Sequence, residues 1–358
     1  MGINEYLEVY KGKKVLITGH TGFKGSWLSI WLKSLGADVI GIALDPYTEK
    51  DNFVLSDIAN KINDYRGDIR NLEAFSKIVE QEKPEILFHL AAQPLVLESY
   101  QNPVYTFETN ILGTVNVLEA FRNSKTLATG VFITSDKCYE NKEWVWGYRE
   151  SDEMGGYDPY SSSKGAAELV INSYRNSFFK DNCKNIASAR AGNVIGGGDW
   201  SPHRIVVDII SAIERGETIE LRNPYSTRPW QHVLEPLGGY LLLGAKMMHE
   251  KGNYCEAWNF GPESSNVLSV ENLTVELIKE FGKGEWIDKS QNQQLHEAGL
   301  LALDINKARI KLNWKPVLDF QETIKYTVDW YKRYNDNNIY DLCMQQIKNY
   351  TYKWNLRS

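Results

Sequence analysis

The sequence predicts an α/β protein in which a doubly wound parallel sheet is joined to a smaller, mixed C-terminal lobe. Three observations support this fold class. The apolar run at 14–18 is followed by glycines at 19, 22 and 25. Short apolar runs then alternate with helical patterns as far as about residue 190, which is the rhythm of strands and helices in a doubly wound sheet. Beyond 190 this alternation breaks into glycine-rich loops and short helical pieces.

The first of these runs predicts a dinucleotide-binding turn. Strand 14–18 is nearly all apolar, as expected of a parallel strand that is buried on both faces. Gly19, Gly22 and Gly25 then serve a tight turn, close approach of the backbone to a pyrophosphate, and close packing of the next helix. The helix expected at 25–35 directs its N-terminal amides at the phosphates. The sheet is therefore expected to be of the Rossmann type.

Asp45 ends the second apolar strand, at 38–44, and lies 20 residues beyond Gly25. An acidic side chain at this distance from the glycines holds a ribose 2′-hydroxyl, which favours NAD over NADP. The alternative is that Asp45 is a turn residue before Pro46.

Further elements continue the pattern and suggest how the chain is divided. Apolar spacings near 3.6 residues predict two long helices, at 103–122 and 158–180. Strands are expected at 85–90, 130–134, 185–190 and 256–260. We expect a dinucleotide-binding domain over 1–190, rejoined by the strand near 256–260, and an interleaved substrate-binding lobe over 191–358.

Composition and charge argue against several classes of protein. The 358 residues carry a formal net charge of −6 and no cluster of basic side chains, so a nucleic-acid partner is not expected. No apolar run approaches the ~20 residues of a membrane span, and the N-terminus does not resemble a signal peptide. Cys138, Cys183, Cys255 and Cys343 form no CxxC pair, and the histidines form no HxxxH pair. We therefore expect a cytoplasmic protein with no membrane association, no disulfide framework and no metal site.

Tyr160 and Lys164 are the first candidate catalytic residues. Asp158 and Pro159 suit the start of a helix, which places Tyr160 and Lys164 one turn apart on one helix face. There an ammonium group can lower the pKa of the phenol, so that the phenol can take a proton from a substrate alcohol. Tyr10 and Lys14 have the same spacing but precede the first strand. The alternative for Tyr160 is an ordinary tyrosine on a helix surface.

Ser135, Asp136 and Lys137 follow the strand at 130–134, and ligands of open α/β sheets bind at the carboxyl ends of strands. Ser135 is expected to orient the alcohol that Tyr160 deprotonates. Asp136 and Lys137 supply a second acid–base pair, which a simple dehydrogenase does not need. A strand-end turn with solvated charges is the alternative interpretation.

Four segments together resemble the CDP-glucose 4,6-dehydratase family of extended short-chain dehydrogenases. They are Gly19–Trp27, Thr134–Asn141, Tyr160–Lys164 and Arg190–Trp200. The resemblance runs from about residue 10 into the 320s. Its most specific part is the Asp136–Lys137 pair followed by Cys-Tyr-Glu-Asn, because dehydratases of the dTDP-glucose and GDP-mannose types carry Asp-Glu at this strand end.

The resemblance implies an internal redox cycle on CDP-glucose. Tyr160 removes the C4 hydroxyl proton while NAD takes the C4 hydride. Asp136 protonates the leaving C6 hydroxyl, C5 loses its proton, and the hydride returns to C6. Lys137 acts either as the C5 base or as a positioning and electrostatic group. As a base it must be neutral, and lowering the pKa of a lysine by about three units costs about 4 kcal/mol.

The resemblance also implies which residues contact the two ligands. The glycines, Asp45, Tyr160 and Lys164 are expected to contact the cofactor NAD. The resemblance implies seven further NAD contacts, namely Thr21, Phe23, Asp68, Ile69, Leu90, Ala91 and Ala92. The nucleotide sugar is expected to meet Gln93, Asn193, Arg204, Arg228 and His232. Arginine forks suit phosphate oxygens, although Arg228 could also belong to a surface turn braced by Pro229.

The family further implies a role in deoxysugar biosynthesis for lipopolysaccharide O-antigen. It also implies a homodimer, or a dimer of dimers, built through the helices at 103–122 and 158–180. Three other functions remain open from the sequence. They are an NAD-dependent nucleotide-sugar 4-epimerase, a UDP-N-acetylglucosamine 4,6-dehydratase, and a non-catalytic dinucleotide-sensing protein.

Overall fold

A seven-stranded sheet forms the centre of the molecule, and every neighbouring pair of its strands is parallel. The computed structural model describes residues 3–180, 184–250, 252–290, 300–336 and 338–357. The strand order is β11-β6-β5-β4-β1-β2-β3. The strands are β1 (Lys14–Thr18), β2 (Asp38–Ala43), β3 (Asn63–Arg66), β4 (Ile86–His89), β5 (Thr129–Ile133), β6 (Asn185–Arg190) and β11 (Ala257–Asn259). The predicted fold class is confirmed.

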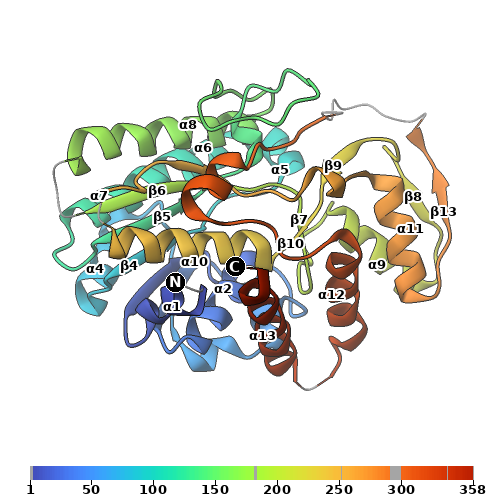
Figure 1. Ribbon diagram of the computed structural model, residues 1–358, viewed down its shortest axis with the longest axis horizontal. Helices are drawn as coiled ribbons and strands as arrows, with labels where there is room; N and C mark the ends of the chain where they lie inside the picture. The colour runs from blue at the N-terminus through green and yellow to red at the C-terminus, as the bar shows by residue number, and fades with distance from the viewer. Residues whose placement is uncertain (1–2, 181–183, 251, 291–299, 337, 358) are drawn as a thin grey trace.

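Helices cover both faces of this sheet (Figure 1). Alternate side chains of one strand point to opposite faces, so Val15 and Ile17 belong to one hydrophobic cluster and Leu16 belongs to another. The first cluster includes α1 (Ile3–Leu7), α2 (Phe23–Ser34), α10 (Leu234–His249) and α13 (Ile339–Arg357). The second includes α4 (Leu72–Glu82), α7 (Gly113–Asn123) and α8 (Pro159–Tyr174).

The two long helices predicted around 103–122 and 158–180 are present, and each contains a π-helical stretch. The first consists of α6 (Pro103–Phe107), a π-helical stretch at Glu108–Leu112, and α7. The second consists of α8 and a π-helical stretch at Arg175–Phe179. Asp158 caps α8 by accepting a hydrogen bond from the Ser161 amide at 2.9 Å, and Pro159 takes the first helical position. The start of α8 is therefore encoded locally, as the sequence predicted.

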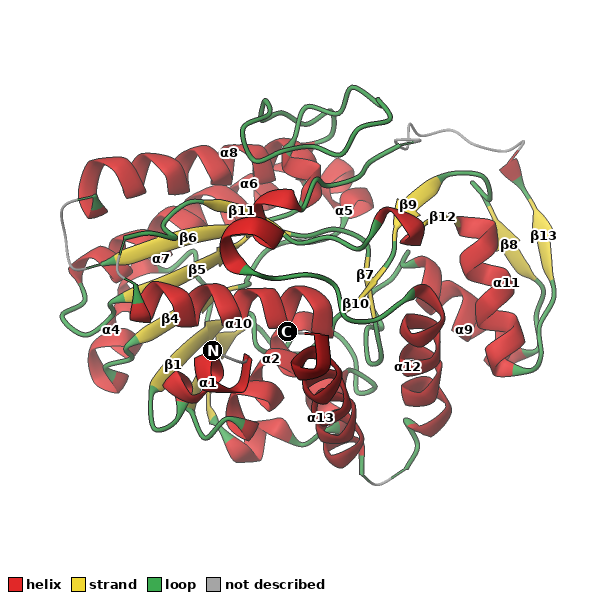
Figure 2. Cartoon of the chain, viewed as in Figure 1, coloured by secondary structure: helices red, strands yellow, loops and turns green. Residues whose placement is uncertain are grey.

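A smaller lobe lies beside the sheet, on the right of Figure 2. It contains α9 (Ile205–Arg215), α11 (Val270–Phe281), α12 (Phe320–Arg333) and three two-stranded sheets. Those sheets pair β7 (Val194–Ile195) with β10 (Gln231–His232), β8 (Ile219–Leu221) with β13 (Trp286–Asp288), and β9 (Thr227–Pro229) with β12 (Val267–Ser269). Between these segments the chain returns to the main sheet through α10 and β11, so the lobe is not one continuous stretch of sequence.

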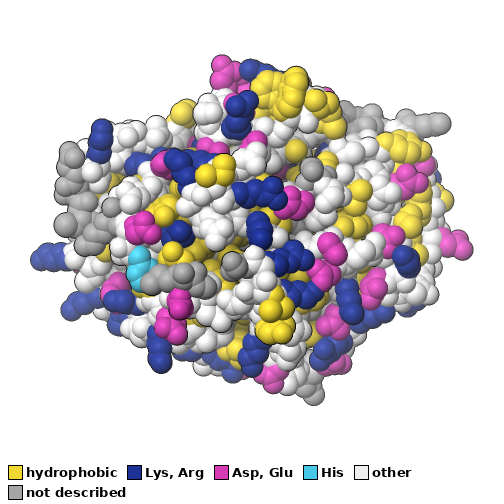
Figure 3. Space-filling view, in the orientation of Figure 1, with side chains coloured by type: hydrophobic (Ala, Val, Ile, Leu, Met, Phe, Trp, Pro, Cys, Tyr) yellow, Lys and Arg dark blue, Asp and Glu magenta, His cyan; other side chains and the backbone are white. Residues whose placement is uncertain are grey.

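The surface mixes charges of both signs. In Figure 3, Lys and Arg side chains are interspersed with Asp and Glu, and hydrophobic side chains gather at the top over the loop between β5 and α8. Val145 and Trp146 of that loop are exposed. None of the helices in the described ranges is both long and apolar enough to cross a membrane. Cys138, Cys255 and Cys343 are free thiols, and Cys183 lies outside the described residues.

Candidate active site

A cavity of about 970 Å³ opens at the carboxyl ends of the strands. Its wall is made by the segments that follow β1, β2, β3, β4, β5 and β6 on one side, and by residues of the smaller lobe on the other. Chain order reverses between β1 and β4, and such switch points are where open α/β sheets bind ligands. The fold alone therefore places a ligand site in this cavity.

The glycine turn after β1 brings three backbone segments into close contact. Gly19 has a φ of +76°, and a Cβ atom there would lie 2.7 Å from the Ala91 amide nitrogen. A Cβ atom on Gly25 would lie 2.1 Å from the Gly19 carbonyl oxygen. Both positions therefore require glycine, and the residues at the start of α2, from Gly22 to Gly25, line the cavity. This cradle fits a dinucleotide pyrophosphate, because backbone N–H groups at a helix N-terminus bind phosphate.

Asp45 lies at the cavity wall with its carboxylate largely exposed. Arg66, at the end of β3, donates a hydrogen bond from its Nε to Asp45 Oδ1 at 3.0 Å. The same guanidinium binds Asp64, whose carboxylate also contacts Nε2 of the buried His20 at 2.7 Å. The aspartate is thus available to a ribose, but part of its charge is already balanced by Arg66.

Ser135, Asp136 and Lys137 form a tight segment after β5. The Ser135 hydroxyl donates to Asp136 Oδ1 at 3.0 Å and accepts from the Lys137 amide at 3.2 Å. Asp136 Oδ2 is buried and has no hydrogen-bond partner in the protein. A buried, unpaired carboxylate oxygen is costly unless a ligand supplies a donor, so this atom marks the place where a ligand hydroxyl fits.

The pKa of the Lys137 amine is lowered, chiefly because the group is removed from water. The carboxylates of Asp136 and Asp158 oppose this effect, and the positive charges of Arg228 and Arg204 add to it. The lysine is therefore easier to deprotonate than an exposed lysine, as general-base catalysis would require.

Tyr160 and Lys164 reach the same cavity from α8. Burial raises the pKa of the Tyr160 phenol to about 12, although a hydrogen bond with Ser135 and the charge of Arg204 both lower it. Burial lowers the pKa of Lys164 to about 8, and the Glu168 carboxylate opposes this effect. The structure therefore brings the five predicted catalytic residues into one cavity, from two separate elements.

The remaining predicted ligand residues divide into two groups. Nearly all of them line the cavity, namely Thr21, Gly22, Phe23, Asp68, Ile69, Leu90, Ala91, Ala92, Asn193, Arg204 and Arg228. Gln93 and His232 do not line it. Gln93 is buried and is held by Thr106 and the backbone of Leu95, and His232 is buried under Trp27 and Tyr326. These two side chains, which the resemblance implied as substrate contacts, therefore lie outside the cavity wall.

Lys24 is a cavity residue that the sequence analysis passed over. It follows Phe23 in the first turn of α2, and its amine has a pKa lowered to about 8. Burial is the main cause, and the positive charges of Arg204 and Lys164 add to it. A lysine inside the glycine turn was itself the signal, since the other residues at 19–25 are three glycines, His20, Thr21 and Phe23.

Comparison with known proteins places this architecture in a family. The family model described as GDP-mannose 4,6 dehydratase matches residues 16–327. The chain belongs to that family. The chain is 46% identical to the CDP-glucose 4,6-dehydratase of Salmonella typhimurium, in an alignment that covers 90% of this chain and 91% of that protein. The resemblance inferred from the sequence motifs is thereby confirmed.

Solved structures resemble this dehydratase-family chain in fold. An epimerase from Methanothermobacter thermautotrophicus aligns with a TM-score of 0.79 over 96% of this chain and 97% of that one, at 23% identity. A dTDP-glucose 4,6-dehydratase from Streptomyces venezuelae, solved with NAD and TYD bound, aligns with a TM-score of 0.74 over 89% and 97%, at 22% identity. At these identities the comparison establishes the shared fold.

Proposed function

We propose that this chain is an NAD-dependent CDP-glucose 4,6-dehydratase, which forms CDP-4-keto-6-deoxyglucose and water. The observation that carries the proposal is the convergence of two acid–base pairs on one cavity, Tyr160 with Lys164 and Asp136 with Lys137. A simple alcohol dehydrogenase needs the first pair, and elimination of water needs the second. The 46% identity to a CDP-glucose 4,6-dehydratase supports the same conclusion.

The residues at the glycine turn fit NAD. The cradle at Gly19 and Gly25 accepts a pyrophosphate, and Asp45 lies where a ribose hydroxyl would meet a carboxylate. When bound, NAD would accept a hydride from C4 of the sugar and return it to C6.

Tyr160 acts first in this scheme, as the base that takes the proton of the C4 hydroxyl. To act as this base the phenol must first lose its own proton. Burial opposes that loss, since it raises the pKa to about 12 in the free protein, whereas the hydrogen bond with Ser135 and the charge of Arg204 favour the phenolate. Lys164, with a pKa of about 8, remains largely protonated near neutral pH and places a positive charge one helical turn away. The resulting 4-ketone acidifies the proton on C5.

Elimination then uses the segment after β5. Asp136, through its unpaired Oδ2, donates a proton to the departing C6 hydroxyl, which leaves as water. Lys137 accepts the C5 proton, which its lowered pKa makes feasible, and gives a proton back to C5 when the hydride is returned to C6. Asp136 regains its proton, and Tyr160 loses the one it took from the C4 hydroxyl, by exchange with solvent, so the protons balance over one turnover. The two groups are neighbours in sequence, so one short segment supplies both the acid and the base.

The smaller lobe supplies cations for the diphosphate of the nucleotide. Arg204 begins α9 and faces Asp199 across 3.9 Å, and Arg228 lies on β9. Asn193 adds an amide from the segment after β6. In this proposal residues 1–190, together with the strand near 256–260, bind the dinucleotide, and residues 191–358 bind the nucleotide sugar.

The direct test is incubation of the purified protein with CDP-glucose and a catalytic amount of NAD. A 4-keto sugar, detected by its alkaline absorbance and identified by NMR, is the expected product, and NAD should not be consumed in proportion to it. Formation of a C4 epimer without loss of water would identify a 4-epimerase. Turnover of UDP-N-acetylglucosamine but not CDP-glucose would identify the other dehydratase, and binding of NAD without any turnover would indicate a sensing protein.

The helices on one side of the sheet suggest how two copies associate. Val104, Leu112, Leu169 and Phe178 are exposed apolar side chains on α6, α8 and their π-helical stretches. Such a set is consistent with a homodimer, or with a dimer of dimers that reuses this contact. Light scattering tests the assembly, and Leu169→Glu should shift it to the monomer. A cytoplasmic location and a role in O-antigen deoxysugar synthesis complete the proposal.

A further inference from the structure

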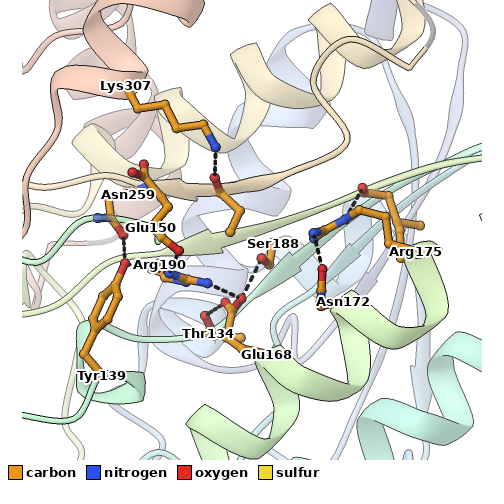
Figure 4. Close-up of polar contacts among 12 residues, drawn as sticks. Thr134, Tyr139, Glu150, Glu168, Asn172, Arg175, Ser188, Arg190, Asn259 and Lys307 are labelled. Carbon is orange, nitrogen blue, oxygen red and sulfur yellow. Dashed lines mark hydrogen bonds and ion pairs between the residues drawn. The ribbon is translucent and has the colours of Figure 1, made fainter. Parts of the chain in front are cut away.

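A buried ion pair between α8 and β6 contacts Thr134 and Tyr139, which stand on either side of the acid–base segment in the chain (Figure 4). Glu168 of α8 and Arg190 of β6 meet at 2.8 Å, and their side chains are only 4% and 5% exposed. Neither residue lines the cavity. Neither charge acts on the sugar directly in the proposed chemistry. Glu168 favours the protonated form of Lys164, and both residues also bind side chains next to the acid–base segment.

Glu168 binds one end of the segment. Its Oε1 accepts a hydrogen bond from the Thr134 hydroxyl at 2.5 Å, and its Oε2 accepts one from Ser188 at 2.8 Å as well as the bond from Arg190. Burial alone would raise the pKa of this carboxyl, but Arg190 and the two hydroxyls outweigh burial and hold the pKa below its usual value. Glu168 is therefore a fixed anion.

Arg190 binds the other end of the segment. Its Nη1 donates to the Tyr139 hydroxyl at 2.6 Å and to the Glu150 carbonyl at 3.3 Å, and its guanidinium lies 4.9 Å from the centre of the Tyr139 ring. Tyr139 in turn donates to Asn259 of β11 at 2.7 Å. The Tyr139 side chain is thus held by β6, which carries Arg190, and by β11, which carries Asn259.

Thr134 and Tyr139 flank Ser135, Asp136 and Lys137, and Glu168 is one helical turn beyond Lys164 on α8. We propose that Glu168 and Arg190 form a positioning pair, which holds both ends of the acid–base segment at a set place relative to the helix that carries Tyr160. This inference rests on the proposed function, in which these two elements must act on neighbouring carbons of one sugar.

Stability alone does not account for the arrangement. A buried ion pair contributes little net stability, because desolvation offsets the attraction. In addition, Arg190 Nε is buried without a hydrogen-bond partner in the protein. By contrast, errors of about 1 Å in the placement of a catalytic group can lower a rate about 10²-fold. A rigid connection between the segment and α8 therefore has a catalytic consequence that an apolar contact would not provide.

The test first removes hydrogen bonds at either end of the segment while leaving the ion pair in place, and then removes the charge of Glu168. Thr134→Val and Tyr139→Phe each free one end of the segment, and each should lower kcat for CDP-glucose several-fold with KM unchanged. Glu168→Gln should lower kcat about 10-fold to 10²-fold. Ser188→Ala is the matched control, because it removes a hydrogen bond to the same carboxylate but leaves both ends of the segment bound. It should keep the parental kcat.

A purely structural role makes a different prediction. In that case all four variants would lower the melting temperature, kcat would stay parental, and the positioning role would be excluded. Equal losses of kcat in Ser188→Ala and Thr134→Val would also exclude the positioning role, because Ser188→Ala leaves both ends of the segment bound.

A second readout does not depend on the substrate. Trace acylation with acetic anhydride, followed by mass spectrometry, reports how reactive Lys137 is relative to the exposed Lys77. If Glu168 places the segment, Glu168→Gln should change the relative labelling of Lys137 several-fold, while Ser188→Ala should not. Unchanged labelling in Glu168→Gln would overturn the inference. If the parent chain makes no 4-keto sugar, the proposed function fails, and the labelling result still decides the positioning role.

Discussion

Replacement of Gly192 by alanine provides a sharp test of the role assigned to Asp136. A Cβ atom at this position would lie 1.8 Å from Asp136 Oδ2 and 1.9 Å from its Cγ. Contacts of a Cβ atom essentially never fall below 3.0 Å. The Asp136 carboxylate must therefore move by at least about 1.2 Å to bring the distance between Oδ2 and the new Cβ from 1.8 Å to 3.0 Å. Because the obstructing group is the end of a side chain and not backbone, we expect Gly192→Ala to fold with its carboxylate displaced.

A displacement of about 1 Å in a catalytic acid corresponds to a loss of about 10²-fold in rate, or about 2.7 kcal/mol of transition-state stabilisation. We therefore expect kcat for 4-keto sugar formation to fall by about this factor. The assay is the initial rate with saturating CDP-glucose and NAD, accompanied by a thermal melt and by calorimetric binding of CDP. Binding of CDP should be preserved, because the substitution is aimed at the sugar end of the site.

Gly261→Ala is the matched control. A Cβ atom there would lie 3.4 Å from the Leu303 side chain and 3.5 Å from that of Ile305, which are ordinary van der Waals contacts. This variant should retain the parental rate. If Gly192→Ala also turns over at the parental rate, and a crystal structure shows Asp136 displaced, then Asp136 is not the acid that releases the C6 hydroxyl.

Four further predictions follow from the site and the core. Tyr160→Phe should lower turnover about 10²-fold or more while CDP-glucose still binds. Its control, Tyr10→Phe, should keep the parental rate but lose about 1 kcal/mol in free energy of unfolding, because it removes a buried hydrogen bond to the Leu241 carbonyl. Lys137→Met should accumulate reduced cofactor in a single turnover while solvent-deuterium exchange at C5 collapses; exchange at the parental rate would leave Lys137 only a positioning role. Asp45→Ala should weaken NAD binding measured by calorimetry, and an unaltered affinity would make Asp45 a turn residue. Burial raises the pKa of Glu235 to about 7 from the usual 4.5. The protonated carboxyl therefore stabilises the fold in full below about pH 4.5, and this stabilisation is lost as the pH rises through about 7. In urea denaturation the free energy of unfolding of the parent should fall over that pH range relative to that of Glu235→Gln.

The sequence contained most of the information about where the ligands bind, because the relevant signals are local. A strand followed by Gly19, Gly22 and Gly25 dictates its own turn, and Asp158 with Pro159 dictates the start of α8. Since parallel strands present their carboxyl ends at one edge of the sheet, residues that follow different strands converge in the cavity. His232, which the family resemblance implied as a substrate contact, does not line the cavity. Its neighbours in space come from α2 and α12 and are not readable from the adjoining sequence.

The sequence by itself determined the α/β order of elements, the glycine turn after β1 and the choice of candidate acid–base groups, since each depends on residues within a few positions of one another. Only the tertiary structure decided how those groups are held and tuned. Arg66 reaches Asp45 from 21 residues away, and Arg190 reaches Tyr139 across 51. The pKa of Tyr160 reflects burial by segments from both parts of the chain. Burial and charge pairing are sums over neighbours in space, and a linear sequence does not specify those neighbours until the chain has packed.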